Sequence, residues 1–186
     1  MTILIGLHGK ARSGKSTVAD YLWDNRKFVD MAFASYVKDA CAAIFGVDPK
    51  LLNDAAFKAM VHEYWGISGR DMLQGVGEIL KEQFGTDLWT RRWKLDYDTI
   101  GHTDNIVASD VRFEHEADLI RGLGGVIVHI HREGAGLSGH NGAHVSEAGI
   151  VIAENDYVIV NDGTIPDLYD KVEDALAELF WGDDEG

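Results

Sequence analysis

The sequence has one cysteine, no long apolar run and few basic residues, and each shortage excludes something. A single cysteine, Cys41, cannot form a disulfide within the chain, which agrees with a reducing cytoplasm. No apolar run is long enough to span a bilayer, and the first residues lack the basic segment and long apolar stretch of a signal peptide. We therefore expect a cytoplasmic protein with no membrane partner.

Basic residues are scarce and grouped. Lysine and arginine number 17 against 31 aspartate and glutamate residues, which gives a formal net charge of −14. Such a field repels polyanions, so we expect no nucleic acid as a partner. The basic residues form one group within residues 10–15 and another within residues 91–94. A local positive pocket of this kind suits a small phosphorylated substrate.

What the sequence does have is a regular alternation of strand and helix patterns. Hydrophobic residues make up 46% of the 186 positions, enough to bury one core. Short apolar runs predict strands at residues 3–7, 28–32, 106–108, 126–130 and 157–160. Helical spacing predicts helices at 17–23, 36–45, 113–123 and 164–180, and a mostly helical middle at 51–97 with breaks near 66–69 and 85. This order predicts a three-layer α/β fold, a parallel sheet with helices on both faces, in one domain spanning residues 1–186.

The segment after the first predicted strand matches the phosphate-binding pattern G-x-x-x-x-G-K-[ST], the P-loop, at every fixed position. With the threonine that follows, its residues are Gly9, Lys10, Ala11, Arg12, Ser13, Gly14, Lys15, Ser16 and Thr17. Backbone N–H groups of such a loop wrap a phosphate, and the next helix presents its positive N-terminal end. We expect Lys15 to reach the β- and γ-phosphates of ATP, Ser16 to bind Mg²⁺ and Arg12 to add positive charge at the transferring phosphoryl group. The alternative is a flexible Gly/Ser loop, which the strand before it and the helical pattern after it disfavour.

A second acidic ligand for Mg²⁺ is expected at Asp110. It stands just past the predicted strand 106–108, at the edge of the sheet where open α/β folds bind ligands. A Walker-B carboxylate lies at such a position. The alternative is that Asp110 caps the helix that begins near Phe113.

Residues 109–117, Ser-Asp-Val-Arg-Phe-Glu-His-Glu-Ala, resemble the signature of phage-type deoxynucleoside monophosphate kinases. Other stretches are similar to segments of that family in the same order along the chain, and together they span nearly all of it. They are residues 33–39, 70–77, 87–89, 129–132, 144–149 and 161–164. The chain departs from the family at Tyr36, where a proline is usual, in its short middle, and in the longer distance from Gln74 to Asp87.

The resemblance implies a role for each matching residue. Lys15, Arg12, Arg132 and Asp110 would be catalytic, the three cations neutralising the transferring phosphoryl group. Arg70 would hold the acceptor phosphate in a planar fork. The other residues implied for the acceptor site are Ala34, Ser35, Lys38, Gln74, Trp89, Asp110, Arg112 and Glu116.

Two segments and the last loop complete what the resemblance implies. Residues 33–98 would form a helical substrate-binding segment, and residues 132–147 a lid that closes over ATP. Asn161 and Gly163 would border the adenine. The alternative for residues 132–147 is a loose surface connection.

Structural alternatives stand beside several of these roles. Trp89 is as consistent with core packing as with stacking on a base, and Arg70 with an ion pair to Asp71 or Glu78. Four histidines, at positions 129, 131, 140 and 144, lie near one another in sequence. No nearby cysteine completes a ligand set, so zinc is disfavoured.

We therefore expect a kinase that moves the γ-phosphoryl group of Mg·ATP to a deoxynucleoside 5′-monophosphate. The alternatives are another small-metabolite P-loop kinase, such as a dephospho-coenzyme-A kinase, or a P-loop regulatory ATPase. The resemblance implies the host cytoplasm for a viral protein, and it leaves a homodimer open.

Overall fold

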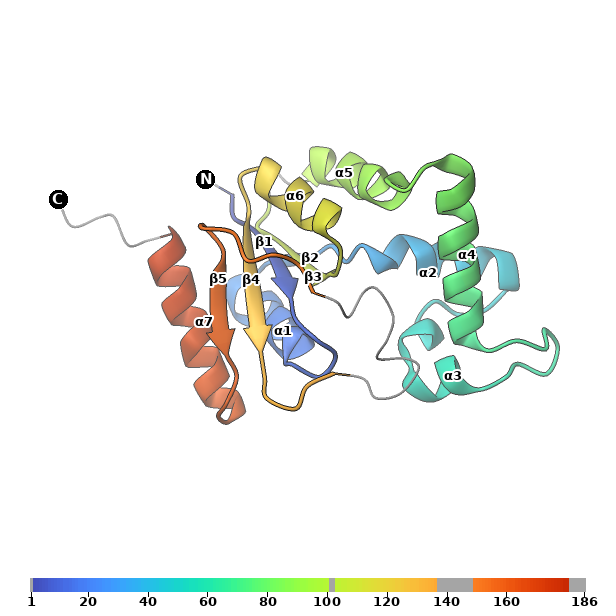
Figure 1. The fold of residues 1–186 in the computed structure, drawn as a ribbon, viewed down its shortest axis with the longest axis horizontal. Helices are drawn as coiled ribbons and strands as arrows, with labels where there is room; N and C mark the ends of the chain where they lie inside the picture. The colour runs from blue at the N-terminus through green and yellow to red at the C-terminus, as the bar shows by residue number, and fades with distance from the viewer. Residues whose placement is uncertain (1, 101–102, 137–148, 181–186) are drawn as a thin grey trace. The chain divides into compact units, whose positions relative to one another are not determined.

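The computed structural model describes residues 2–100, 103–136 and 149–180, and within them a five-stranded parallel sheet. The strands are β1 (Leu4–His8), β2 (Val29–Asp30), β3 (Ile106–Val111), β4 (Val126–His131) and β5 (Tyr157–Val160). Their order is β2-β3-β1-β4-β5, so the first strand of the chain lies in the middle of the sheet (Figure 1). The predicted α/β fold with a parallel sheet is confirmed.

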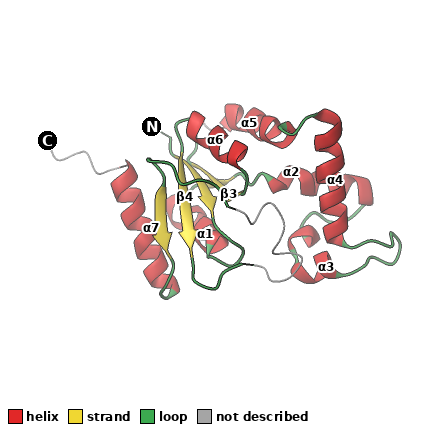
Figure 2. Cartoon of the chain, in the orientation of Figure 1, coloured by secondary structure: helices red, strands yellow, loops and turns green. Residues whose placement is uncertain are grey.

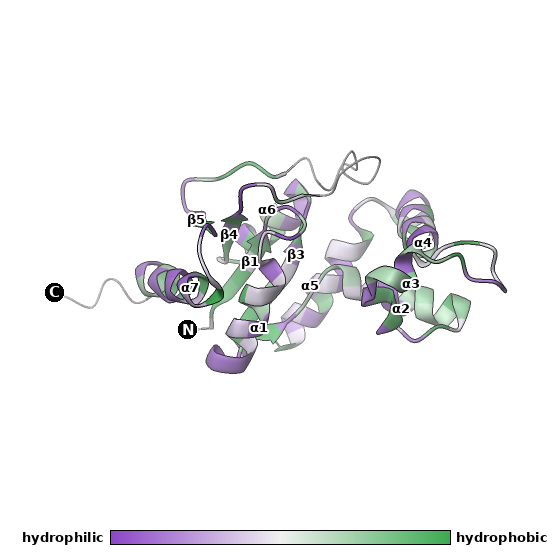
Figure 3. Cartoon of the chain, turned by 90° about the horizontal axis from the view of Figure 1, so that it is seen from below, coloured by the Kyte–Doolittle hydropathy of each residue, from purple (hydrophilic) through white to green (hydrophobic). Residues whose placement is uncertain are grey.

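Helices cover both faces of this sheet. On one face, α1 (Lys15–Arg26) and α7 (Ile165–Phe180) share a buried core with Ile5 and Leu7 of β1. Gly6 points to the opposite face because side chains alternate along a strand, and there it approaches Ile120 of α6 (Glu114–Gly122). Figure 2 shows the three helices around the strands, and in Figure 3 hydrophobic colour gathers on the strands between them.

The chain divides into two compact units. One contains the sheet and comprises the residues up to Ala32 and from Tyr97 onward; the other is Phe33–Asp96. The second unit contains α2 (Ala34–Phe45), a short 3₁₀ helix η1 (Leu51–Asn53), α3 (Ala55–Ala59) and α4 (Gly69–Phe84), and α5 (Leu88–Ile100) begins in it. Its core gathers Cys41, Leu52, Met72 and Val76, and the Cys41 Sγ lies 3.4 Å from the carbonyl oxygen of Met72.

The predicted helices and strands are confirmed, but their lengths differ: α1 is longer than the predicted 17–23, and two strands differ as well. β2 is only two residues long. β3 continues to Val111, so Asp110 is the second-last residue of the strand and does not lie beyond it. Gly6 pairs with Ala108 but His8 pairs with Val111, so β3 carries one extra residue opposite β1. This bulge falls at Ser109 and Asp110. Because both residues are polar, the sequence pattern suggests that the strand ends before them.

Within the described residues, no helix combines the length and the apolar character needed to cross a membrane.

Candidate active site

The P-loop begins where β1 ends and leads into α1, and its two fixed glycines are required by close contacts. A Cβ on Gly9 would lie 2.3 Å from the carbonyl oxygen of Ile130, and one on Gly14 would lie 2.7 Å from Nδ2 of Asn161. Gly14 is also the N-cap of α1, with a φ of 113° that favours glycine. The loop is therefore packed against β4 and against the residue that follows β5.

The N-terminus of α1 has no side-chain cap and no nearby acidic residue that would compete with an anion. Its cap makes no side-chain hydrogen bond and its first turn carries no acidic residue. The Lys15 ammonium lies over the loop and donates to the carbonyl oxygens of Gly9 and Lys10, the latter at 2.9 Å. The Ser13 hydroxyl is buried and has no hydrogen-bond partner among the described residues. Backbone N–H groups at a helix start, the positive end of the helix and an unsatisfied buried hydroxyl fit a phosphate group.

Asn161 supports the P-loop from behind. Its side chain is 5% exposed, and Nδ2 donates to the Ser13 carbonyl oxygen at 2.7 Å. Its backbone N–H donates to the carbonyl oxygen of His131 at the end of β4, also at 2.7 Å. The side chain is thus engaged with the loop backbone, and contact of Asn161 and Gly163 with adenine remains a prediction.

A pocket of about 260 Å³ lies beside the P-loop in the sheet-containing unit. The loop contributes Gly9, Lys10 and Ser13 to its wall, and Arg132 borders it at the exit of β4. Residues 149–152, which lead toward β5, line the other side with Ile150 and Ile152. The predicted lid lies mostly at 137–147, outside the described residues.

Asp110 and two neighbours lie at the carboxyl end of β3. The Ser109 hydroxyl donates to Asp30 at the end of β2, at 2.8 Å. The N-cap of α6 is Phe113, and the carboxylate of Glu116 accepts the N–H groups of Arg112 and Phe113 at 2.7 and 3.1 Å. The alternative that Asp110 caps this helix is therefore wrong.

Glu116 is buried and senses the charge of Asp110. Burial raises the pKa of its carboxyl group to about 7; the hydrogen bond from the Arg112 N–H opposes this rise, and the negative charge of Asp110 adds to it. Glu116 thus stabilises the start of α6 beside Asp110, and its predicted contact with substrate remains a prediction.

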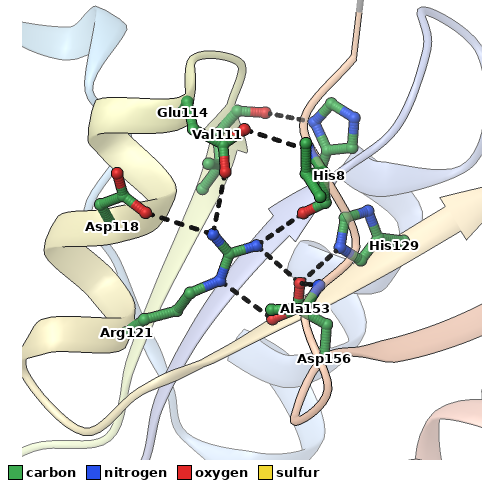
Figure 4. Close-up of polar contacts among 9 residues, drawn as sticks. His8, Val111, Glu114, Asp118, Arg121, His129, Ala153 and Asp156 are labelled. Atoms are coloured by element: carbon green, nitrogen blue, oxygen red, sulfur yellow. Dashed lines mark hydrogen bonds and ion pairs between the residues drawn. The ribbon is translucent and has the colours of Figure 1, made fainter.

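A buried polar network lies on the α6 face of the sheet and was not predicted from the sequence (Figure 4). Asp156, 1% exposed, accepts hydrogen bonds from Arg121 at 2.6 Å and from the Ala153 N–H at 2.8 Å, and His129 lies 3.0 Å away. Arg121 also donates to the carbonyl oxygen of Val151. The network joins α6 and β4 to residues 151–156.

Asp156 is expected to make stability depend on acid pH. Burial disfavours its charged form, but the hydrogen bonds from Arg121, Ala153 and His129 outweigh burial and hold its pKa at about 2. Because the folded pKa lies below the ordinary value of about 4, the stabilisation is present above pH 4 and is lost as the pH falls toward 2. Asp156→Asn should lower the free energy of unfolding by about 2 kcal/mol or more at pH 6.

Urea unfolding at pH 6 and at pH 3 measures this effect. Asp118→Asn is the matched control, because Asp118 also contacts Arg121, at 3.4 Å, but is 66% exposed. The control should change stability by less than about 0.5 kcal/mol. Equal effects of the two substitutions would contradict a special role of Asp156.

The predicted acceptor residues of the second unit lie on three helices. Ala34, Ser35 and Lys38 lie in the first turns of α2, Arg70 and Gln74 one turn apart on α4, and Trp89 on α5. Asp110, Arg112 and Glu116 belong to the sheet-containing unit.

The alternatives for Arg70 and Trp89 can be compared with the contacts inside the second unit. The Asp71 carboxylate accepts from the Ser68 N–H and hydroxyl at the start of α4, at 2.9 and 2.5 Å. In the part of the chain that the structure describes, no ion pair joins Arg70 to Asp71 or Glu78. Trp89 is half-buried, and its Nε1 lies 3.4 Å from the Gly77 carbonyl oxygen. The side chain therefore packs within the unit while part of it stays exposed, which is compatible with both alternatives.

The second basic group of the sequence does not form a free positive cluster. Arg91 pairs with Asp87 at 3.2 Å, and Arg92 pairs with Asp96 at 2.5 Å, in each case one helical turn away. Arg92 also lies over the ring of Tyr36, whose hydroxyl donates to Asp96 at 2.9 Å. These carboxylates offset the positive charge expected there.

Comparison with known proteins agrees across most of the chain. The sequence model of the family described as deoxynucleotide monophosphate kinase matches residues 47–172. A putative deoxynucleotide monophosphate kinase of Acanthamoeba polyphaga mimivirus is 33% identical over 184 residues, covering 91% of this chain and 94% of the relative. The deoxynucleotide monophosphate kinase of Enterobacteria phage T4 is 26% identical, covering 95% and 99%. That of Escherichia phage RB69 is 34% identical over 119 residues, covering 62% and 47%.

Proposed function

The chain belongs to the deoxynucleotide monophosphate kinase family, a family of phosphotransferases, and from that premise we propose that it transfers the γ-phosphoryl group of Mg·ATP to a deoxynucleoside 5′-monophosphate. The observation that carries this proposal is the P-loop, in which an α1 N-terminus without a side-chain cap, the Lys15 ammonium and the unsatisfied Ser13 hydroxyl belong to one short segment. Family membership supports a monophosphate acceptor over a dephospho-coenzyme-A kinase or a regulatory ATPase.

Positioning and charge would supply the catalysis. The N–H groups at the start of α1 would hold the phosphates, and Lys15 would move from the loop carbonyls onto them. Arg132, exposed at the border of the pocket, and Arg12 would add positive charge. Ser16 and Asp110 would hold Mg²⁺, which supplies positive charge to the phosphate oxygens when it is bound.

The panel of acceptors tests this proposal directly. ATP consumption is measured with each deoxynucleoside and ribonucleoside monophosphate, and the diphosphate product is quantified by chromatography. ATP use should rise in proportion to an added deoxynucleoside monophosphate and be small without one. ATP hydrolysis at the same rate with and without every acceptor would contradict the proposed function.

Arg70→Lys is expected to weaken binding of the acceptor. A guanidinium can hold a phosphate through two parallel hydrogen bonds, which an ammonium cannot, so KM for the monophosphate should rise roughly tenfold, with a smaller change in kcat. Steady-state kinetics with the monophosphate varied at saturating ATP measures this.

Arg91→Lys is the matched control for Arg70→Lys. Arg91 is an exposed arginine whose partner, Asp87, lies on the surface of the same unit. The control should leave both KM values unchanged. A rise confined to the KM for ATP in Arg70→Lys would instead place Arg70 in the donor site.

A further inference from the structure

His8 links the strand before the P-loop to the carboxyl end of β3. It is the last residue of β1 and directly precedes Gly9. Its Nδ1 lies 3.0 Å from the carbonyl oxygen of Val111, the last residue of β3 (Figure 4). A carbonyl oxygen can only accept, so Nδ1 must carry a proton to donate.

This hydrogen bond is made where the backbone pairing of β1 and β3 is interrupted. The register moves from Gly6 opposite Ala108 to His8 opposite Val111, and the extra residue of the bulge lies between them. A bulge leaves part of the ladder unpaired and changes where its side chains point. The His8 side chain connects β1 to β3 at Val111, the residue that follows Asp110.

The imidazole of His8 is itself held in place. It meets the ring of His129 edge to face, with centroids 5.2 Å apart, and His129 is held by Asp156. Burial lowers the pKa of His8, opposed by its bond to the Val111 carbonyl, so the neutral ring is favoured. Because His129 restricts the His8 ring, the hydrogen bond from that ring can restrict the position of the Val111 backbone.

We propose that His8 is a positioning residue that sets Asp110 relative to the P-loop through its Nδ1–H bond to Val111. This inference rests on the proposed function, in which Asp110 holds Mg²⁺. His8 acts on the backbone of Val111, the residue next to Asp110, and its hydrogen bond ties the proposed metal ligand to the strand that leads into Gly9.

Two substitutions of His8 distinguish the role of Nδ1 from that of Nε2. The amide nitrogen of asparagine can take the place of Nδ1, whereas that of glutamine extends to the place of Nε2. His8→Gln should raise the Mg²⁺ concentration for half-maximal rate roughly tenfold, the effect of one lost hydrogen bond, and His8→Asn should raise it less than about twofold. Both lose the contact with His129, so their difference reports the Nδ1 donor.

The Mg²⁺ dependence of the initial rate at saturating substrates measures this difference, and thermal unfolding of each variant shows whether they are equally folded. The same Mg²⁺ response in both variants would overturn the proposal, whether the response is unchanged or equally weakened. A wild-type protein without Mg²⁺-dependent kinase activity would overturn the proposed function instead.

A measurement on the wild-type protein keeps the proposal testable if either variant fails to fold. The ¹⁵N chemical shifts of the His8 imidazole distinguish the two neutral tautomers. A protonated Nδ1 with a free lone pair on Nε2 is expected. A ring protonated at Nε2 alone would overturn the proposal, because it cannot donate to Val111.

Discussion

Lys15→Ala is expected to reduce phosphoryl transfer by at least a hundredfold while leaving the fold intact. The lysine ammonium is the P-loop cation expected to contact the β- and γ-phosphates as charge develops on them, and removing one such group typically costs about 10²–10³-fold in rate. The side chain donates to the backbone of Gly9 and Lys10 and is not part of the hydrophobic core, so its removal opens no buried cavity.

An ATP-consumption assay with a saturating acceptor, together with circular dichroism, measures both halves of this expectation. Lys50→Ala is the matched control, since Lys50 is an exposed lysine of the second unit outside the P-loop. The control should retain normal turnover. A folded Lys15→Ala protein with near-normal turnover would contradict a role of the P-loop in phosphoryl transfer.

Asp110→Asn is expected to reduce turnover about a hundredfold and to raise the Mg²⁺ concentration needed for half-maximal rate. The change removes one negative charge and preserves the shape of the side chain. Steady-state rates across a Mg²⁺ titration measure it. Unchanged turnover with an unchanged Mg²⁺ dependence would place the metal acid elsewhere.

Glu116 provides a readout of Asp110→Asn that does not depend on activity. Because the charge of Asp110 contributes to raising the pKa of Glu116 to about 7, its removal should lower that pKa. Titration of the Glu116 carboxyl group by NMR detects the change. Asp118→Asn, an exposed substitution on the same helix, is the control and should leave the Glu116 titration as it is.

The strands, the helices and the P-loop could be predicted because their signals are local. Periodic apolar residues mark each helix, and the P-loop motif is recognised from eight consecutive positions. The end of β3 could not be predicted, because the register of a strand depends on its partner. Ser109 and Asp110 are polar in sequence, but pairing resumes beyond them between Val111 and His8 of β1, so they remain in the strand as a bulge.

Residues that act through distant partners were also missed. In the sequence His129 belongs to a stretch similar to the family and to a possible metal-ligand group, whereas its contact with Asp156 joins positions that are 27 residues apart. The contact of Asn161 with adenine remains a prediction, and the structure adds that its amide donates to the carbonyl oxygen of Ser13, 148 residues earlier. In each case the chemistry was visible in the residue type, but the partner is determined by the fold. His8 stands directly before the loop, but its position in the sequence does not reveal its partner Val111.

The position of β1 in the middle of the sheet also determines when the sheet can begin to form during synthesis of the protein. β1 and β2 do not pair with each other, and each needs β3, which begins at Ile106. At about 5–20 residues per second, the ribosome takes several seconds to reach it, and the whole unit Phe33–Asp96 is made in the meantime. The P-loop motif therefore leaves the ribosome early, but the Ile130 carbonyl and the Asn161 amide that pack against it are among the later residues made. The packing that fixes the P-loop can therefore form only after residue 161 has been made.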